Sequence, residues 1–353
     1  MLGNLSNGLK WLLWPFSAIY QFITWLRNYL YDHHLFKNYA SPIFTISVGN
    51  LTVGGTGKTP HLEYLLRLLD KKAKLATLSR GYGRQTKGFR VATLLSMASE
   101  IGDEPLQFYR KFGQTVPVVV CEKRAEGLQR IEKNYPETQL VLLDDAFQHR
   151  AVQARLHILL TDYNRPFYED FVLPMGRLRE WRGGAKRADA VVVSKCPHHL
   201  FEREKEQICA KILPYIQSQT PIFFSVIRYG TPQPYFSNQP VWNPALPCLT
   251  LSGIAQPLVF QAAAQAQFSV VGNLIYADHH RYKTTDLTVI LNKARNRPLL
   301  TTEKDWVKLL PLLAETKQEN SSSFYYWPIE VTFLPSPNGS FDEWLLAKLP
   351  PKK

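Results

Sequence analysis

The sequence predicts an α/β protein with a mostly parallel sheet and helices on both faces. From about residue 41 to residue 194, short apolar runs alternate with amphipathic stretches, which is the pattern of parallel strands joined by helical crossovers. The chain has 353 residues, enough for a second, smaller α/β lobe with its own core. An uncharged aromatic segment near the N-terminus adds a separate helix.

Strand-like runs with a β-branched and aromatic composition occur throughout the chain. The expected strands are residues 43–48, 74–79, 116–121, 140–143, 156–161, 190–194, 222–227, 248–253, 297–302 and 324–331. A helix is expected at about 257–266. The run 324–331 is expected to pair with 222–227 as a two-stranded hinge, at a sheet edge because Pro328 lacks an N–H donor.

Residues 52–59 read Thr-Val-Gly-Gly-Thr-Gly-Lys-Thr, between the strand at 43–48 and an amphipathic helix at 61–69. Glycines let the backbone N–H groups turn toward an anion, and the following helix N-terminus favours negative charge. Thr52 stands where the general phosphate-loop pattern has glycine; the plain alternative is a glycine-rich turn before a helix. The candidate nucleotide-binding residues are Thr52, Val53, Gly54, Gly55, Thr56, Gly57, Lys58 and Thr59. Lys58 would reach the β- and γ-phosphates, and Thr59 would bind Mg²⁺.

The charge balance predicts an anionic partner. Lysine and arginine exceed aspartate and glutamate by 42 − 29, a net charge of +13. Residues 11–26 carry no charge, hold three Trp, and are too short to span a bilayer at 16 residues. Lys10 and Arg27 flank them, so we expect a helix lying in a membrane interface. A core or oligomer-forming helix is the alternative.

Carboxylates follow two of the predicted elements. Asp144 and Asp145 end the strand at 140–143, where Mg²⁺ could be bound, although a solvated turn is the alternative. Asp103 and Glu104 open a helix, where they could act on a ligand or only complement the helix dipole.

Basic and histidine-rich strings supply further candidates. Residues 177–184 hold three arginines and Glu180, which suit a phosphoryl group or form a solvated face. Residues 79–84 could bind phosphate or form a turn. His279 and His280 follow Asp278 and could handle a proton or be structural. Thr302 is expected to cap a helix.

Several strings in one order resemble the tetraacyldisaccharide 4′-kinase family, the lipid A 4′-kinases of Gram-negative bacteria. The resemblance runs from about residue 10 to residue 310, and Thr52 is the residue expected in this family. The strings are GN-x-TVGGTGKTP (49–60), SRGYGR (79–84), GDEP (102–105), LDDAFQHR (143–150), LP-x-GRLRE (173–180), DHHRY (278–282) and TEKD (302–305).

The resemblance implies a P-loop kinase that transfers the γ-phosphate of ATP, with Mg²⁺, to the 4′-hydroxyl of a tetraacylated glucosamine disaccharide 1-phosphate, giving lipid IVA. It implies a location at the cytoplasmic face of the bacterial inner membrane. From the uncharged segment and its basic flanks we expect peripheral contact with an anionic bilayer there, and no nucleic acid partner is expected. The resemblance also implies roles for individual residues: Asp103 as catalytic carboxylate with His279, Glu104, Asp144 and Asp145 near Mg²⁺, and Lys58, Arg179 and Glu180 at the reaction centre. Closure of the second lobe would complete the site.

The expected segments are a membrane-associated helix (1–35), a P-loop kinase domain (36–221), a hinge (222–247), a smaller α/β domain (248–322), and a returning hinge strand with the C-terminal segment (323–353). Two other functional classes fit parts of the pattern. One is a P-loop switch or assembly ATPase with an anionic partner. The other is a nucleic-acid-binding ATPase, suggested by the charge and disfavoured because no nucleic-acid-binding module is recognisable.

Overall fold

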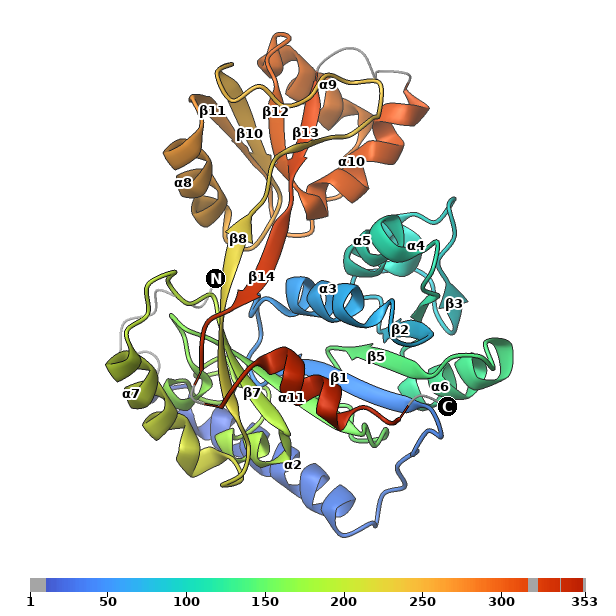
Figure 1. Cartoon of the computed structure of the whole chain (residues 1–353), viewed down its shortest axis with the longest axis vertical. Helices are drawn as coiled ribbons and strands as arrows, with labels where there is room; N and C mark the ends of the chain where they lie inside the picture. The colour runs from blue at the N-terminus through green and yellow to red at the C-terminus, as the bar shows by residue number, and fades with distance from the viewer. Residues whose placement is uncertain (1–10, 317–322, 337, 352–353) are drawn as a thin grey trace. The chain divides into compact units, whose positions relative to one another are not determined.

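The computed structural model describes residues 11–316, 323–336 and 338–351, so Lys10 lies outside the described part. The chain forms two compact units, and both are α/β (Figure 1). The first unit comprises Met1–Arg80, Cys121–Ile227 and Val331–Lys353, and the second comprises Gly81–Val120 and Arg228–Glu330. The second unit therefore includes Gly81–Val120, which the sequence had assigned to the kinase domain.

The sheet of the first unit has the strand order β14-β8-β7-β6-β1-β5-β2. The neighbours from β8 to β2 pair in parallel, as predicted. The strands are β1 (Phe44–Asn50), β2 (Leu75–Ser79), β5 (Leu140–Asp144), β6 (Leu156–Asp162), β7 (Ala190–Ser194), β8 (Ile222–Tyr229) and β14 (Ile329–Phe333). Its helices are α2 (Trp14–Asp32), α3 (Lys58–Leu69), α6 (Arg124–Asn134), α7 (Glu202–Ile212) and α11 (Phe341–Lys348), with short 3₁₀ turns at Phe167–Glu169, Arg182–Arg187 and Leu213–Tyr215.

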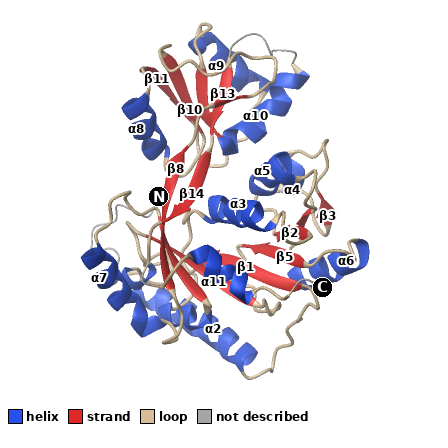
Figure 2. Ribbon diagram, viewed as in Figure 1, coloured by secondary structure: helices blue, strands red, loops and turns tan. Residues whose placement is uncertain are grey.

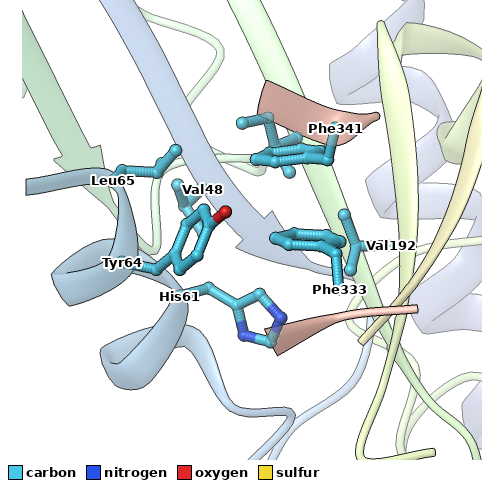
Figure 3. A pocket seen from close by; sticks show the side chains of 8 residues that line it. Val48, His61, Tyr64, Leu65, Val192, Phe333 and Phe341 are labelled. Carbon is cyan, nitrogen blue, oxygen red and sulfur yellow. The ribbon is translucent and has the colours of Figure 1, made fainter. Parts of the chain in front are cut away.

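Both faces of this sheet are covered, which explains why β2, β5 and β7 are buried at every position and β1 and β6 at all positions but one. On β7, Val191 and Val193 pack in a core with Ile208 of α7 and Tyr20 of α2. Val192, between them, faces the opposite side. On that side lies a small pocket lined from β1, α3, β6, β7, β14 and α11 (Figure 3). The lining residues are Val48, His61, Tyr64, Leu65, Ile158, Val192, Phe333 and Phe341.

The second unit is built on a five-stranded sheet of order β11-β10-β12-β13-β9. β10 (Cys248–Ser252), β11 (Val270–Ile275), β12 (Leu299–Thr302) and β13 (Phe324–Trp327) are parallel, and β9 (Gln233–Pro234) is antiparallel. Figure 2 shows the helices of this unit in blue: α8 (Pro257–Gln267), α9 (Thr284–Ala294) and α10 (Glu303–Glu315). Gly81–Val120 adds β3 (Arg90–Val91), α4 (Ala98–Ile101), α5 (Asp103–Phe112) and β4 (Val118–Val120).

The predicted hinge strand 324–331 is two strands. Pro328 separates them, since it cannot donate a ladder hydrogen bond. β13 pairs with β12 in the five-stranded sheet, and only β14 lies beside β8. The expected pairing with 222–227 therefore holds for the second half of the run and is wrong for the first.

Helix α2 exposes its apolar residues and buries small polar ones. Trp14, Phe22 and Trp25 are each more than half exposed, whereas Ser17 and Thr24 are buried. The alternative of a core helix is therefore wrong. Within the described residues, no helix has the length and apolar character needed to cross a bilayer.

Candidate active site

The phosphate loop joins the buried strand β1 to the N-terminus of α3, as the sequence predicted. Gly54 has φ 113° and Gly57, which caps α3, has φ 84°. A side chain at either position would be strained in this left-handed region, so glycine is required at both. The resulting turn at a helix N-terminus is a cradle for an anionic phosphate.

A distant segment lies against the start of this loop. The Val53 N–H donates to the Arg177 carbonyl at 2.8 Å, and the Arg179 N–H donates to the Leu51 carbonyl at 2.7 Å. The arginine-rich string at 177–184 is thus adjacent to the phosphate loop, which sequence separation alone could not reveal.

Lys58 is held near the mouth of the cradle by two oxygens. Its Nζ lies 3.3 Å from Asn50 Oδ1 and 3.7 Å from Asp145 Oδ1. The Asn50 amide also donates to the Thr52 carbonyl at 2.7 Å. Asn50 therefore fixes both the first residue of the loop and its lysine, a role that was not assigned from sequence, although Asn50 lies directly before the loop.

Asp144 and Asp145 lie at the carboxyl end of β5, beside β1, because Asp144 is in register with Val48. Arg179 Nη1 contacts both carboxylate oxygens of Asp145 at 2.9 Å. Asp144 is buried next to the Arg124 guanidinium, which contacts its backbone carbonyl at 3.4 Å. Burial lowers the pKa of Arg124 to about 10, against the opposing effect of the Asp144 charge.

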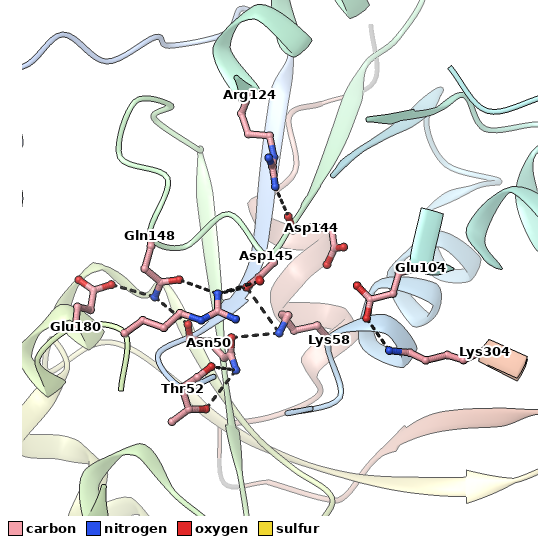
Figure 4. A network of polar contacts seen from close by, with 11 residues as sticks. Asn50, Thr52, Lys58, Glu104, Arg124, Asp144, Asp145, Gln148, Glu180 and Lys304 are labelled. Atoms are coloured by element: carbon pink, nitrogen blue, oxygen red, sulfur yellow. Dashed lines mark hydrogen bonds and ion pairs between the residues drawn. The ribbon is translucent and has the colours of Figure 1, made fainter. Parts of the chain in front are cut away.

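Glu180 has a supporting position within this network. The residue is only 1% exposed. Its Oε1 accepts from Arg187 at 2.7 Å and from Gln148 at 3.0 Å, and its Oε2 accepts from Asn28 of α2 at 2.7 Å. Gln148 in turn donates to the Asn50 carbonyl at 2.9 Å (Figure 4). We expected Glu180 to line the reaction centre, but its buried carboxylate instead links α2 to the strand that precedes the phosphate loop.

Asp103 and His279 form a pair within the second unit. Asp103 is the first residue of α5, and its Oδ2 lies 2.9 Å from His279 Nδ1. This hydrogen bond is the main cause that raises the pKa of His279 above its ordinary value, against partial burial. His280 instead contacts Asp286 at 3.1 Å. Of the two candidate histidines, His279 is thus the one paired with Asp103.

Glu104, expected near Mg²⁺, is also in the second unit and forms an ion pair with Lys304 at 2.9 Å. Nearby carboxylates, Glu104 first, raise the pKa of Lys304 although burial opposes this. Thr302 caps α10 as predicted, accepting from the Asp305 N–H at 3.2 Å.

The remaining family strings meet around this pair. Tyr282 donates to the buried Asp305 at 2.9 Å, which connects the DHHRY string to the TEKD string. Arg281 donates to the Gly83 carbonyl at 2.8 Å, which connects DHHRY to SRGYGR. Seven strings therefore form two clusters, one around the phosphate loop and one around Asp103 and His279.

The residues fit ATP and Mg²⁺ in their chemistry. The loop offers backbone N–H groups and a lysine for phosphates, and Thr59, Asp144 and Asp145 offer the oxygen donors that Mg²⁺ prefers. Within the described ranges, no three His, Cys, Asp or Glu side chains are grouped as a self-sufficient metal site. A metal at this place would therefore share its coordination with nucleotide phosphates.

Comparisons with known proteins find relatives of a single family along nearly the whole chain. A family model described as tetraacyldisaccharide-1-P 4′-kinase matches residues 9–350. The tetraacyldisaccharide 4′-kinase of Flavobacterium psychrophilum is 43% identical over 93% of this chain and 94% of its own. That of Porphyromonas gingivalis is 38% identical over 98% of both chains.

A solved structure supports the same relationship. The crystal structure of LpxK from Aquifex aeolicus in complex with ATP matches with a TM-score of 0.76 and 26% identity, over 97% of this chain and 99% of that one. The match of the family model over nearly the whole sequence, together with these relatives, establishes kinship at the level of the complete fold. The chain belongs to the tetraacyldisaccharide 4′-kinase family and is a kinase.

Proposed function

We propose that the protein transfers the γ-phosphate of ATP to the 4′-hydroxyl of a tetraacylated glucosamine disaccharide 1-phosphate, which gives the bis-phosphorylated product lipid IVA. The observation that carries this proposal is the combination of a lysine-bearing phosphate loop with a carboxylate–histidine pair, Asp103 and His279. A loop alone would also suit a switch ATPase. The added pair supplies the base that an alcohol acceptor needs.

The chemistry follows from these groups. The sugar hydroxyl oxygen attacks the γ-phosphorus, the bond from that phosphorus to the ADP oxygen breaks, and the hydroxyl proton passes to the Asp103 carboxylate. The His279 Nδ1–H orients this carboxylate through its hydrogen bond at 2.9 Å. Lys58 and Arg179 offset negative charge on the phosphates. This scheme requires the Asp103–His279 pair to reach the nucleotide in the working enzyme.

Mg²⁺ is the metal we propose for this site, held by Thr59 with Asp144 and Asp145. When bound, it would neutralise part of the phosphate charge. Glu104 was a further candidate ligand, and its ion pair with Lys304 gives it a competing partner.

The proposed location is the cytoplasmic face of the bacterial inner membrane, with α2 lying in the interface. Its outward side is apolar and aromatic, while its inward side contacts the protein through polar groups. Ser17 donates to the Val172 carbonyl at 3.0 Å, and Tyr20 donates to the Arg179 carbonyl at 3.1 Å. A helix with this reversed polarity is stable where its outer surface meets lipid.

The decisive test is transfer of labelled γ-phosphate to the acylated disaccharide by purified full-length protein. We expect a 4′-phosphorylated lipid product with ATP. Steady ATP hydrolysis without a lipid product would favour the switch-ATPase alternative and overturn the proposal.

Membrane attachment is tested separately with vesicles that contain anionic lipid. We expect the double variant Phe22→Ser/Trp25→Ser to bind at least several-fold more weakly than wild type. The matched control Leu258→Ser/Val259→Ser alters an apolar pair on α8 that is at least as exposed as Phe22 and Trp25. Equal loss in both variants would contradict a specific role for α2.

A further inference from the structure

Three consecutive carbonyl groups of the phosphate loop each accept a side-chain hydrogen bond. The Gly55 carbonyl accepts from Lys195 Nζ, the Thr56 carbonyl accepts from Ser194 Oγ at 2.8 Å, and the Gly57 carbonyl contacts His61 Nδ1 at 2.7 Å. All these residues belong to the first unit. We call Ser194, Lys195 and His61 the outer brace of the loop.

Lys195 and Ser194 reach the loop from the carboxyl end of β7. Lys195 has φ 58°, a left-handed conformation that a lysine rarely adopts. Its Nζ is also held by Asp162 Oδ2 at 2.7 Å, at the end of the neighbouring strand β6. An uncommon backbone conformation retained at a contact of this kind indicates that the surrounding structure fixes it.

His61 completes the brace from within α3. A carbonyl can only accept, so His61 Nδ1 carries the hydrogen toward Gly57, and in the neutral ring Nε2 accepts from the Ser225 hydroxyl at 2.8 Å. The ring is buried. Ser225 lies on β8, so the brace connects the loop to the last parallel strand of the sheet.

The direction of these bonds has a consequence for anion binding. In a trans peptide the N–H group points opposite to the carbonyl of the same peptide unit. Holding the Thr56 and Gly57 carbonyls on the outer side therefore turns the N–H groups of Gly57 and Lys58 to the inner side. Inward N–H groups in succession are what bind a phosphate at a helix N-terminus.

We propose that Ser194, Lys195 and His61 are positioning residues that hold the phosphate loop in its anion-binding conformation before ATP arrives. The conformational entropy of the loop is then given up during folding, so ordering the loop does not weaken the binding of ATP. We choose Lys195 for the test because it fixes the Gly55–Thr56 peptide, whose N–H donates to the Gly54 carbonyl at 3.1 Å and closes the turn that precedes the Gly57 and Lys58 N–H groups. Lys195 is itself anchored by Asp162. The inference rests on the proposed function only in taking ATP as the donor.

The test measures nucleotide affinity in the full-length protein by calorimetry, without lipid. For Lys195→Met we expect the Kd for ATP to rise about ten-fold, equivalent to about 1.4 kcal/mol. The affinity for ADP should fall in parallel and the affinity for AMP should not, because the outer brace acts on the part of the loop that binds the β- and γ-phosphates. Lys195→Arg, which keeps a cationic donor, should recover most of the affinity.

Matched controls separate this role from general destabilisation. Lys211→Met removes an exposed ion pair with Glu169 and should leave every nucleotide affinity unchanged. Asp162→Asn releases Lys195 without deleting it, and should raise the Kd for ATP with little added effect in the double variant with Lys195→Met. Asp162→Asn also tests the inference if Lys195→Met does not fold.

Two results would overturn the inference. One is an ATP affinity in folded Lys195→Met or Asp162→Asn within two-fold of wild type. The other is an equal weakening of AMP and ATP, which would place Lys195 at the base or ribose. The experiment measures nucleotide binding, so a failure to detect phosphoryl transfer to the lipid would contradict the proposed function but not the role of the outer brace.

Discussion

Asp103 and His279 are the residues on which the proposed chemistry depends most directly. Replacing Asp103 with Asn keeps the shape of the side chain but removes the carboxylate that would take the proton. We expect kcat to fall about 10²- to 10⁴-fold, the usual contribution of a general base, while ATP affinity changes little. The measurement is phosphoryl transfer alongside ATP calorimetry. Transfer at the wild-type rate would contradict the assignment.

The same substitution makes a pH prediction. The Asp103 hydrogen bond raises the pKa of His279, so protonated His279 is favoured in the fold. The stabilising contribution is complete below the ordinary histidine value of 6.5 and is lost as pH rises through the raised pKa. In Asp103→Asn the pKa of His279 should fall, as followed by NMR titration, whereas Asp286→Asn should not change it. An unchanged pKa in Asp103→Asn would show that the pair does not persist in solution.

Glu180 leads to a prediction about stability. Its buried carboxylate accepts from Arg187, Gln148 and Asn28. Glu180→Ala leaves Arg187 without its carboxylate and should destabilise the protein by about 3 kcal/mol, as expected when one partner of a buried pair is removed. Urea unfolding measures this change. Glu180→Gln, which keeps the volume and two polar atoms but removes the charge, should lose less stability. Wild-type stability in Glu180→Ala would contradict the supporting role of this carboxylate.

At the scale of elements, α11 closes one face of the first sheet. Phe341 stacks on Phe333 of β14 with ring centroids 4.1 Å apart (Figure 3). Tyr64 of α3 donates to Asp342 at 2.5 Å. Burial of Tyr64 raises the pKa of its hydroxyl, and the hydrogen bond to Asp342 raises it further. The C-terminal helix thus packs on the same helix that begins at the phosphate loop.

Truncating this contact predicts a measurable loss. Phe341 is 3% exposed, so Phe341→Ala should create a cavity and lower the free energy of unfolding by about 3 kcal/mol. Urea denaturation followed by tryptophan fluorescence reports it. The exposed Phe201→Ala, at 73% exposure, is the control and should cost little. Similar losses in both would mean that α11 contributes nothing specific.

At the scale of the whole molecule, the charge of +13 and the apolar face of α2 predict two separable contributions to membrane binding. Raising salt from 0.1 to 1 M shortens the Debye length from about 10 Å to about 3 Å. Partition to anionic vesicles should therefore fall more than ten-fold, while the weaker partition to neutral vesicles changes little. Sedimentation with vesicles measures both, and salt-independent binding to anionic vesicles would exclude the charge as a cause.

The element pattern was predictable because it is local. The apolar runs became strands close to the expected bounds, as at 190–194, and α3 followed the loop. The predictions were wrong where tertiary packing determines which sheet or unit a segment joins. Pro328 divided one predicted strand between two sheets, and Gly81–Val120 grouped with the second unit. Neither outcome could be predicted, because the periodicity of a segment does not specify which sheet or unit it joins. The short edge strand β9 and the C-terminal helix α11 gave too little pattern to predict.

The sequence by itself determined the chemistry of this protein: a phosphate loop after a strand, carboxylates after another, and the strings of its family. These are short-range signals, in which residue type and spacing fix the local backbone. Only the tertiary structure decided which groups meet. Lys195 braces the Gly55 carbonyl 140 positions away, and Asn28 of α2 holds Glu180 across 152 positions. Such contacts follow from strand order and helix packing, and no local pattern records them.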